Sequence, residues 1–444
     1  MKFVQTRIIF ICILFCYLIV SLFLIWRMTT LQPYSDMLDW LSRYLDFQND
    51  GKLTKYLLEP HNFHRIAWTL GAIAIDVKQF GAHGYTLVSL NSACLAAVCG
   101  MLAWIAVRGV VKEQRVFIGG VAVMLSLMAA NLLDASIPIN GVYAQCLAFS
   151  LAAILLGEHR DSEDGPGWAA GAGALAMVAC ATLGSAVGFV ALPVLLVGAW
   201  QRRARRIWIA TILIAGSCYA GLYAYGNALP HAASSGGPNI IQAIVFGLSY
   251  LGLPWTRVSP ALGLITGGTV LALAVVALFL HGRRGTTAPH RLSTQLIVFT
   301  LGTVILAMIA RTDTEAPTNV PVRYSIFLAP LHVGLLMLLW DAFGKAETRF
   351  PRGAAIAVIF AAATMLGQQV AMGYVLVSVT DKNRNLIADF RSGKRDPSMS
   401  PTVHWNLEHA ANIRARLDQK GLYLREIHLA KSQRNSDHRG ITSQ

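Results

Sequence analysis

The chain has 444 residues, of which 55% are hydrophobic and 14% charged, and its mean hydropathy is +0.51. Soluble domains carry about 25% charged residues, so this composition excludes a soluble enzyme held by a single membrane anchor. The net charge of +14 does not indicate a nucleic-acid-binding protein, because much of it lies in short loops between apolar runs.

The apolar runs predict an all-α integral membrane protein. Runs of about 18 to 25 residues are long enough to cross the hydrocarbon as helices. The strands of a membrane β-barrel would be shorter and would alternate polar with apolar residues. We expect eleven spans, at approximately 8–29, 84–107, 115–133, 141–157, 167–183, 185–200, 207–225, 258–280, 293–310, 325–342 and 353–376.

The Lys and Arg residues of the short loops predict that the N-terminus is cytoplasmic. No small-residue cleavage site follows the first span, so we expect it to be retained rather than removed as a signal peptide. Segment 240–256 is apolar but short, and Gly, Ser and Pro interrupt it. Counting it as a span would place Arg283 and Arg284 outside, so we expect a re-entrant or interfacial helix there.

This topology predicts a polytopic domain over residues 1–379 and a hydrophilic, outward-facing tail over 380–444. Within the tail, Asn406 to Leu417 is expected to form a short amphipathic helix that ends before Gly421.

The first outer loop, residues 30–83, is the most informative stretch of the chain. It is predicted to contain two interfacial helices. One starts at Asp36 and presents Leu38, Leu41 and Leu45 on one face. The other runs from Ile66 to Phe80, and its apolar face is expected to contain Ile66, Leu70, Ile73 and Phe80. Trp40 and Trp68 are expected to anchor them in the membrane interface.

Asp36 and Asp39 are the candidate catalytic residues. Positions i and i+3 lie on one face of a helix, and a carboxylate just above the membrane can deprotonate an acceptor hydroxyl or help to hold a metal ion. The alternative is structural, because Ser35 and Asp36 are both good helix N-caps.

His61, Asn62, His64 and Arg65 form a second candidate cluster. Arg holds phosphate in a bidentate fashion, and His can donate to phosphate or shuttle a proton. The cluster therefore predicts contact with a phosphorylated substrate. The alternatives are a hydrated loop in which Asn62 caps a helix, or a metal site at the two histidines.

A third cluster lies late in the chain, on the predicted outer side, and consists of Arg311, Asp313, Glu315, Arg323 and Tyr324. Outward-facing Arg residues run against the charge bias of membrane loops, and a substrate phosphate would explain them. The alternative is that they snorkel at helix ends. Weaker polar signals surround the second outer loop: Asn131, Asp134, Asn140, Tyr143 and Gln145.

This arrangement resembles the GT-C class of membrane glycosyltransferases over roughly residues 1 to 376. Asp36, in Tyr34-Ser35-Asp36, matches the acidic residue at the start of that class's first outer loop. The stretch from His61 to Arg65 is similar to a His-Asn-x-His-Arg motif of related bacterial membrane proteins, and Arg323-Tyr324 is similar to an Arg-Tyr pair that opens a late span. The chain departs from the class in having its two carboxylates three residues apart, which leaves the base open between Asp36 and Asp39. It also departs from it in its short tail.

The resemblance implies a bacterial inner-membrane glycosyltransferase or polysaccharide polymerase of envelope or exopolysaccharide synthesis. Its donor would be a sugar linked to polyprenyl phosphate or diphosphate at the periplasmic face, and its acceptor a glycan or lipid. Asp36 would act as base, supported by Asp39, while His64, Arg65 and Arg323 would hold the phosphate. No cofactor is required, although a divalent cation is compatible with this chemistry. A polymerase or ligase of different architecture, a lipid-linked glycan flippase and a non-catalytic component of an assembly complex are the alternatives.

Overall fold

A computed structural model describes residues 3–61, 64–159, 166–225, 239–253, 255–282, 287–311, 316–344 and 352–422. Regular structure in these residues is helical, apart from one isolated bridge between His61 and His64. The α-helices are α1 (Phe3–Met28), α2 (Asp36–Asp50), α3 (Leu53–Leu58), α4 (Ala67–Phe80), α5 (Tyr85–Ala106), α6 (Arg115–Ser126), α7 (Ala129–Ser136), α8 (Gly141–Gly157), α9 (Trp168–Thr182), α10 (Ala191–Gln201), α11 (Arg206–Ala224), α12 (Ile240–Leu251), α13 (Pro260–Gly282), α14 (Ala288–Arg311), α15 (Ala329–Gly344), α16 (Arg352–Arg391), α17 (Ser400–Val403) and α18 (Leu407–Gln419). Short 3-10 helices are η1 (Pro138–Asn140), η2 (Ala186–Val190), η3 (Trp255–Arg257), η4 (Val322–Leu328) and η5 (Pro397–Met399).

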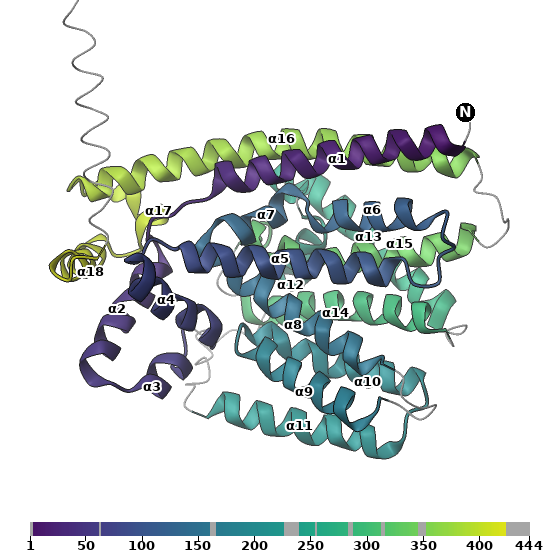
Figure 1. The fold of residues 1–444 in the computed structure, drawn as a ribbon, viewed down its shortest axis with the longest axis horizontal. Coiled ribbons are helices and arrows are strands. Elements are labelled where there is room, and N and C mark those ends of the chain that lie inside the picture. Colours follow the sequence, from purple (N-terminus) through teal and green to yellow (C-terminus); the bar gives the residue numbers. More distant parts are fainter. Residues whose placement is uncertain are drawn as a thin grey trace, which may run out of the picture.

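The long helices run side by side and form a bundle whose axis is horizontal in Figure 1. Within the described residues, eight helices are long and apolar enough to cross a membrane, and the bent pair of α6 and α7 would make a ninth. The spans expected at 167–183 and 185–200 correspond to α9 and to η2 with α10, which are shorter apolar helices. The multi-span, all-helical architecture is therefore confirmed, while the count of eleven stays a prediction.

The span expected at 115–133 is not continuous, because α6 and α7 meet at an angle of 61°. Carbonyl groups freed at such a break must find donors inside a membrane. Tyr17 of α1 donates to the Met124 carbonyl at 2.8 Å, and Gln369 of α16 donates to the Leu127 carbonyl at 2.8 Å. These two side chains allow the chain to bend there.

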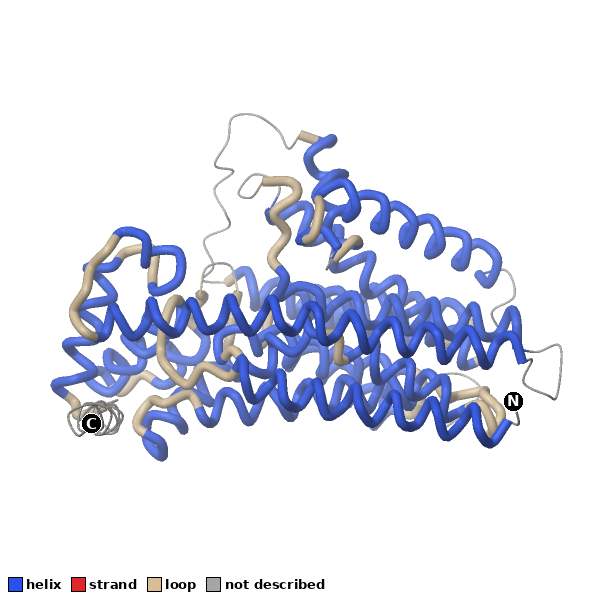
Figure 2. Tube along the Cα trace, turned by 90° about the horizontal axis from the view of Figure 1, so that it is seen from above, coloured by secondary structure: helices blue, strands red, loops and turns tan. Residues whose placement is uncertain are grey.

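Helix α16 has 40 residues and lies along α1 (Figures 1 and 2). At 1.5 Å per residue it is about 60 Å long, twice the hydrocarbon thickness of about 30 Å. The domain boundary predicted at residue 379 therefore falls inside a helix that continues well beyond the span. In this extension Arg384 donates to the carbonyls of Arg27 at 2.7 Å and Thr29 at 2.6 Å, where the cation also complements the C-terminal end of the α1 dipole.

The first loop and the C-terminal segment pack together at one end of the bundle (Figure 1). We call α2, α3, α4, α17 and α18 the surface module. Its core joins Leu38, Leu41 and Leu45 of α2 to Ile413 and Leu417 of α18. The amphipathic faces predicted for 36–45 and 406–417 are confirmed, and they cover one another.

Two details of the first loop differ from expectation. Trp40 does not anchor the module in the interface, because it is only 2% exposed and its ring packs edge-on against His61, with 5.4 Å between ring centroids. Phe80 is 48% exposed although it was expected to lie on the same face as the buried Leu70 and Ile73. Trp68 remains partly exposed.

Docking of α18 on α2 is expected to depend on Ile413, which is 1% exposed. Replacing it with Ala removes buried methyl groups and should cost about 2–4 kcal/mol. We expect faster hydrogen exchange in the α18 amides of the Ile413→Ala variant, measured by mass spectrometry. Asn412→Ala, at an exposed position of the same helix, is the matched control. Equal exchange in both variants would show that α18 is not held by this contact.

Candidate active site

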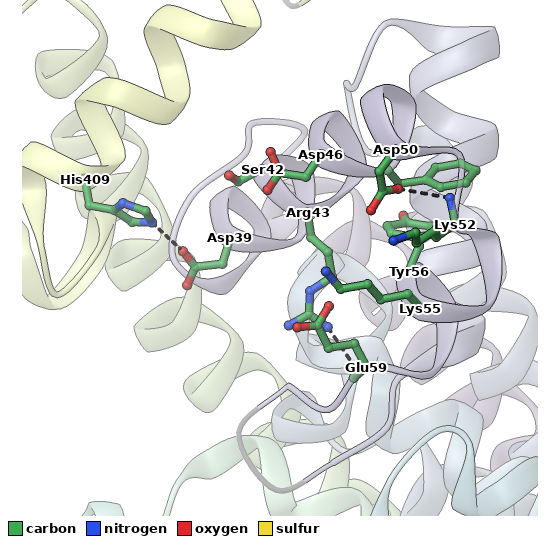
Figure 3. A pocket seen from close by; sticks show the side chains of 11 residues that line it. Asp39, Ser42, Arg43, Asp46, Asp50, Lys52, Lys55, Tyr56, Glu59 and His409 are labelled. Atoms are coloured by element: carbon green, nitrogen blue, oxygen red, sulfur yellow. Dashed lines mark hydrogen bonds and ion pairs between the residues drawn. The ribbon is translucent and has the colours of Figure 1, made fainter. Parts of the chain in front are cut away.

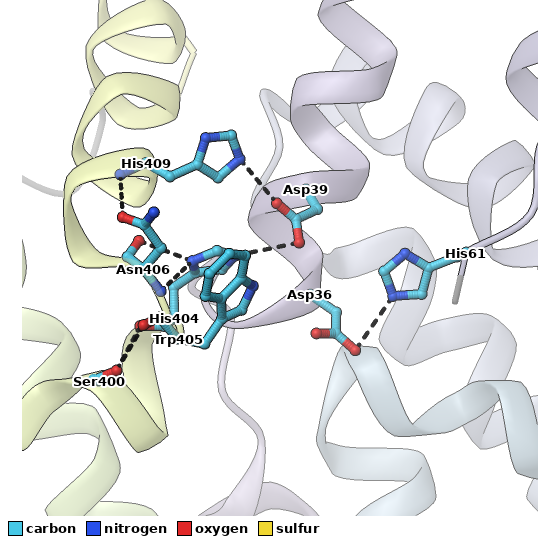
Figure 4. Close-up of polar contacts among 8 residues, drawn as sticks. All are labelled: Asp36, Asp39, His61, Ser400, His404, Trp405, Asn406 and His409. Carbon is cyan, nitrogen blue, oxygen red and sulfur yellow. Dashed lines mark hydrogen bonds and ion pairs between the residues drawn. The ribbon is translucent and has the colours of Figure 1, made fainter. Parts of the chain in front are cut away.

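Asp36 opens α2 and lies between groups from three parts of the chain. Its Oδ2 is 3.4 Å from Nε2 of His61, a contact that lacks the alignment of a hydrogen bond. The side chain is 47% exposed, so solvent and a substrate can reach it (Figure 4). His61 lowers the pKa of the Asp36 carboxyl, burial opposes the shift, and the charges of Arg323 and His404 lower the pKa further. Asp36 is therefore an ionised carboxylate at neutral pH.

The backbone at the start of α2 argues against a simple helix cap. Ser35 occupies the N-cap position but makes no side-chain cap hydrogen bond, and its φ of 51° and ψ of −140° are rare for a residue with a side chain. Such a conformation costs about 1–3 kcal/mol and persists only where the surroundings enforce it. Here the Ser35 amide donates to the Val403 carbonyl of the C-terminal segment at 2.5 Å.

Asp39 has partners different from those of Asp36, although the two were predicted to share a face. Its Oδ2 lies 3.2 Å from Nε2 of His404, and its Oδ1 lies 3.2 Å from Nε2 of His409 (Figure 4). His404 is almost fully buried, and its Nδ1 also contacts the backbone of Asn406. Asp39 thus joins α2 to the C-terminal segment, and its catalytic role remains a prediction.

His61 and His64 form the two ends of a tight turn. The His61 amide donates to the His64 carbonyl at 2.7 Å, and the His64 amide donates back at 2.9 Å. Burial lowers the pKa of His64 to about 4, with smaller effects from the charges of Arg311 and His61. Its ring is therefore neutral at pH 7, and Nδ1 accepts from the Ala186 amide at 3.4 Å. Asn62 lies outside the described residues.

Arg65 points toward the end of α11 rather than toward Asp36. Its guanidinium donates to the carbonyls of Leu58, Tyr223 and Tyr225, the last at 2.7 Å, and lies 5.7 Å from the centre of the Tyr223 ring. A cation at the C-terminal end of a helix complements its dipole. Arg65 therefore joins the first loop to α11. A phosphate contact by this residue remains a prediction.

Arg323 lines a cavity of about 490 Å³, and its charge acts on Asp36. It lies in η4 beside Tyr143, with its guanidinium carbon 5.7 Å from the centre of the Tyr324 ring. Its buried Nε has no hydrogen-bond partner within the described part of the chain. The cavity is lined by Leu133, Asn140, Arg257, Asn319, Pro321, Val322 and Arg323.

The other predicted late residues lie close to this region. Tyr324 is buried, and its carbonyl accepts from the Tyr250 hydroxyl at 3.2 Å. Arg311 ends α14 near enough to influence His64 and Tyr143 electrostatically. The structure thus brings together Asp36, His61, His64, Arg311 and Arg323, which lie far apart in the sequence. Asp313 and Glu315 lie outside the described residues.

A further carboxylate, that of Asp134, interacts electrostatically with Arg323. Asp134 of α7 is fully buried, and neither of its oxygens has a hydrogen-bond partner among the residues described. The sequence indicated this residue only weakly, as a polar position beside an outer loop. In the structure it gives Arg323 two acidic neighbours, Asp134 and Asp36.

Four polar residues of this region were not predicted. Arg257 donates to Asn319 Oδ1 at 2.8 Å and to the Val320 carbonyl at 2.6 Å, which places both side chains at the cavity. Arg257 is a further cation on the predicted outer side, so the charge argument used for Arg323 could have found it. His404 and His409 carry no such signal, because only the docking of α18 brings them to α2.

No group of three or more His, Cys, Asp or Glu side chains suited to a metal ion occurs among the described residues. Dependence on a divalent cation therefore remains an untested prediction.

Comparison with known proteins yields one fold likeness. No family model matches the chain, and no curated protein matches it. Among solved structures, the chain is similar to the crystal structure of ArnT from Cupriavidus metallidurans in the apo state, with 17% sequence identity and a TM-score of 0.48. The similar region covers 86% of this chain and 80% of the other. The function proposed below rests on the chain's own residues.

The contact between Asp36 and His61 generates a prediction about acidity. Since His61 is the main cause of the lowered pKa of Asp36, His61→Gln should raise that pKa toward its ordinary value. Carbodiimides modify carboxyl groups in their protonated form, so the pH midpoint of Asp36 labelling, followed by mass spectrometry, should move upward. His83→Gln replaces a histidine that is not among the groups acting on Asp36 and should leave the midpoint in place. An unmoved midpoint in His61→Gln would contradict the assigned cause.

Proposed function

We propose that this chain is a membrane glycosyltransferase that uses a polyprenyl-phosphate-linked sugar. The observation that carries the proposal is an ionised, solvent-accessible carboxylate, Asp36, under the influence of the charge of Arg323, which lines a cavity at one end of a membrane bundle. A base for a hydroxyl and a cation for a phosphate are the two groups that such a transfer requires.

In the proposed reaction, Asp36 accepts the proton of an acceptor hydroxyl while that oxygen attacks the anomeric carbon of the donor sugar. The bond from this carbon to the phosphate oxygen breaks, and its electron pair leaves with the polyprenyl phosphate. Arg323 lies where it can stabilise the charge that develops on the phosphate, with Arg257 and Arg311 as further cations nearby. Donors that are held in place before the reaction give the largest stabilisation.

His64 and Asp39 take supporting roles in this proposal. A neutral His64 whose Nδ1 accepts a hydrogen bond carries its remaining proton on Nε2, and it can donate that proton to a substrate oxygen. Asp39 holds α2 against the C-terminal segment through His404 and His409. We therefore assign the base to Asp36 rather than to Asp39.

The membrane side of the site is also part of the proposal. The loop from α5 to α6 carries Arg108 and Lys112, and Arg115 opens α6. Arg202, Arg203 and Arg205 lie between α10 and α11, and Arg206 opens α11. Both loops lie at the end of the bundle opposite the surface module (Figure 1). Basic loops mark the cytoplasmic side, which supports a periplasmic site in a bacterial inner membrane. A role in envelope or exopolysaccharide synthesis, as a transferase or a polymerase, follows from this proposal.

The first test replaces the proposed base. In membranes of a deletion strain of the source organism complemented with each variant, Asp36→Asn should lower glycosylated product by about 10²- to 10⁴-fold, the usual contribution of a general base. Asp389→Asn, a partly exposed carboxylate on α16, is the matched control and should behave as wild type. Normal product from a fully expressed Asp36→Asn protein would exclude carboxylate catalysis and favour a flippase or a non-catalytic component.

The second test concerns the donor phosphate. Losing one hydrogen bond from a charged donor should weaken donor binding by about 10- to 100-fold, so Arg323→Gln should raise the half-saturating donor concentration by that factor. The measurement is transfer of labelled sugar in membranes at varied polyprenyl-phosphate-sugar concentration. Arg395→Gln, which removes an arginine that packs on Phe390, is the control. Unchanged donor saturation would remove Arg323 from the phosphate site.

A further inference from the structure

A second polar cleft lies in the surface module, between α2 and α3 (Figure 3). It has a volume of about 260 Å³. Its lining includes Asp39 and Asp46 of α2, Lys52 and Lys55 near α3, Glu59, and His409 of α18. The function proposed above assigns no ligand to this space.

Both walls of the cleft lead to the candidate base. One wall is α2, in which Asp39 follows Asp36 by a single helical turn. The opposite wall runs through Lys55 to Glu59, and His61, the partner of Asp36, follows two residues later. Asp39 lines the cleft, and Asp36 lies one helical turn earlier on the same helix, so the cleft lies beside the part of α2 that carries the candidate base.

The cleft is held open by fixed contacts between its walls. Arg43 of α2 donates to the carbonyls of Glu59 at 2.9 Å and Pro60 at 3.2 Å, which ties the two walls together at the floor. Phe47 and Tyr56 stack across it with ring centroids 5.1 Å apart, and the Tyr56 hydroxyl donates to the Leu70 carbonyl at 2.7 Å. A cleft fixed before binding loses little entropy when a ligand enters.

The charged side chains of the cleft fall into two groups, those paired within the protein and those without a partner among the described residues. Asp39 is paired with two histidines, and Asp46 accepts from Arg416 at 2.6 Å. The side chains of Lys52, Lys55 and Glu59, in contrast, make no hydrogen bond or ion pair to any residue that the structure describes. Two ammonium donors and one carboxylate acceptor thus face a space next to the base.

We propose that this cleft binds the saccharide portion of the acceptor, so that one of its hydroxyls reaches Asp36. A polyhydroxylated molecule matches a lining of separate donors and acceptors, because each sugar hydroxyl both donates and accepts. The volume is below the range of about 300–1,000 Å³ of pockets that enclose a drug-sized ligand. This size favours one or two sugar rings, with the rest of the acceptor outside. The inference rests on the proposed glycosyltransferase function.

The test separates acceptor binding from catalysis. Membranes carrying the full-length chain are supplied with labelled polyprenyl-phosphate-sugar and increasing amounts of total glycolipid extract from the deletion strain. Because hydrogen bonds from charged donors are lost, the double variant Lys52→Ser/Lys55→Ser should need about tenfold more extract for half-saturation. Its donor saturation and its maximal rate should match wild type. Lys78→Ser, at an exposed position of α4 that does not line the cleft, is the matched control.

The outcomes distinguish the two proposals. If Asp36→Asn is inactive but the double lysine variant has wild-type extract saturation, the cleft is not the acceptor site and the proposed function stands. If Asp36→Asn makes product at the wild-type rate, the proposed function fails and the inference falls with it. A double variant that loses maximal rate with unchanged saturation would also overturn the inference, because it would show a role in the reaction rather than in acceptor binding.

Discussion

The candidate site depends on the packing of α2 against the C-terminal segment. A leucine face of α2 meets the apolar face of α18, and around this contact Asp39 engages His404 and His409 while Arg416 engages Asp46 and Ser42. An isolated helix of 15 residues is marginally stable in water, so α2 requires this partner to keep a fixed direction. The direction of α2 in turn sets where Asp36 points.

Asp36 and Asp39, the first two carboxylates of α2, have different surroundings and therefore suit different roles. Asp36 faces His61 and the field of Arg323 and stays half exposed, which suits a group that must exchange a proton with a substrate. Asp39, one turn later, has both oxygens occupied by histidines of the C-terminal segment. Under the proposed function, Asp36 takes part in the reaction and Asp39 in assembly, because their environments differ. The strained backbone at Ser35 also depends on the packing of α2 against the C-terminal segment, because the Ser35 amide donates to the Val403 carbonyl.

The sequence predicted the individual helices better than the contacts between them. Hydropathy located most long helices within a few residues, and amphipathic spacing found both α2 and α18. Charge bias singled out Arg323, and the position of Asp36 after the first span singled out that carboxylate. The bend between α6 and α7 was missed because apolar side chains continue through it, while the donors that permit it, Tyr17 and Gln369, come from distant helices. The burial of Trp40, the carbonyl contacts of Arg65 and the histidines that hold Asp39 are likewise tertiary facts without a local signal.

The contact between Asp39 and His404 joins residues 365 positions apart. During synthesis α2 is made early, but it cannot pack against its partner until α17 and α18 have been made. Helix α16 brings the C-terminal segment back along α1 to the same end of the bundle. Assembly of the candidate site is therefore coupled to synthesis of the C-terminal segment. A protein truncated before α17 would contain every predicted span and still lack the contacts that fix the direction of α2 and of Asp36.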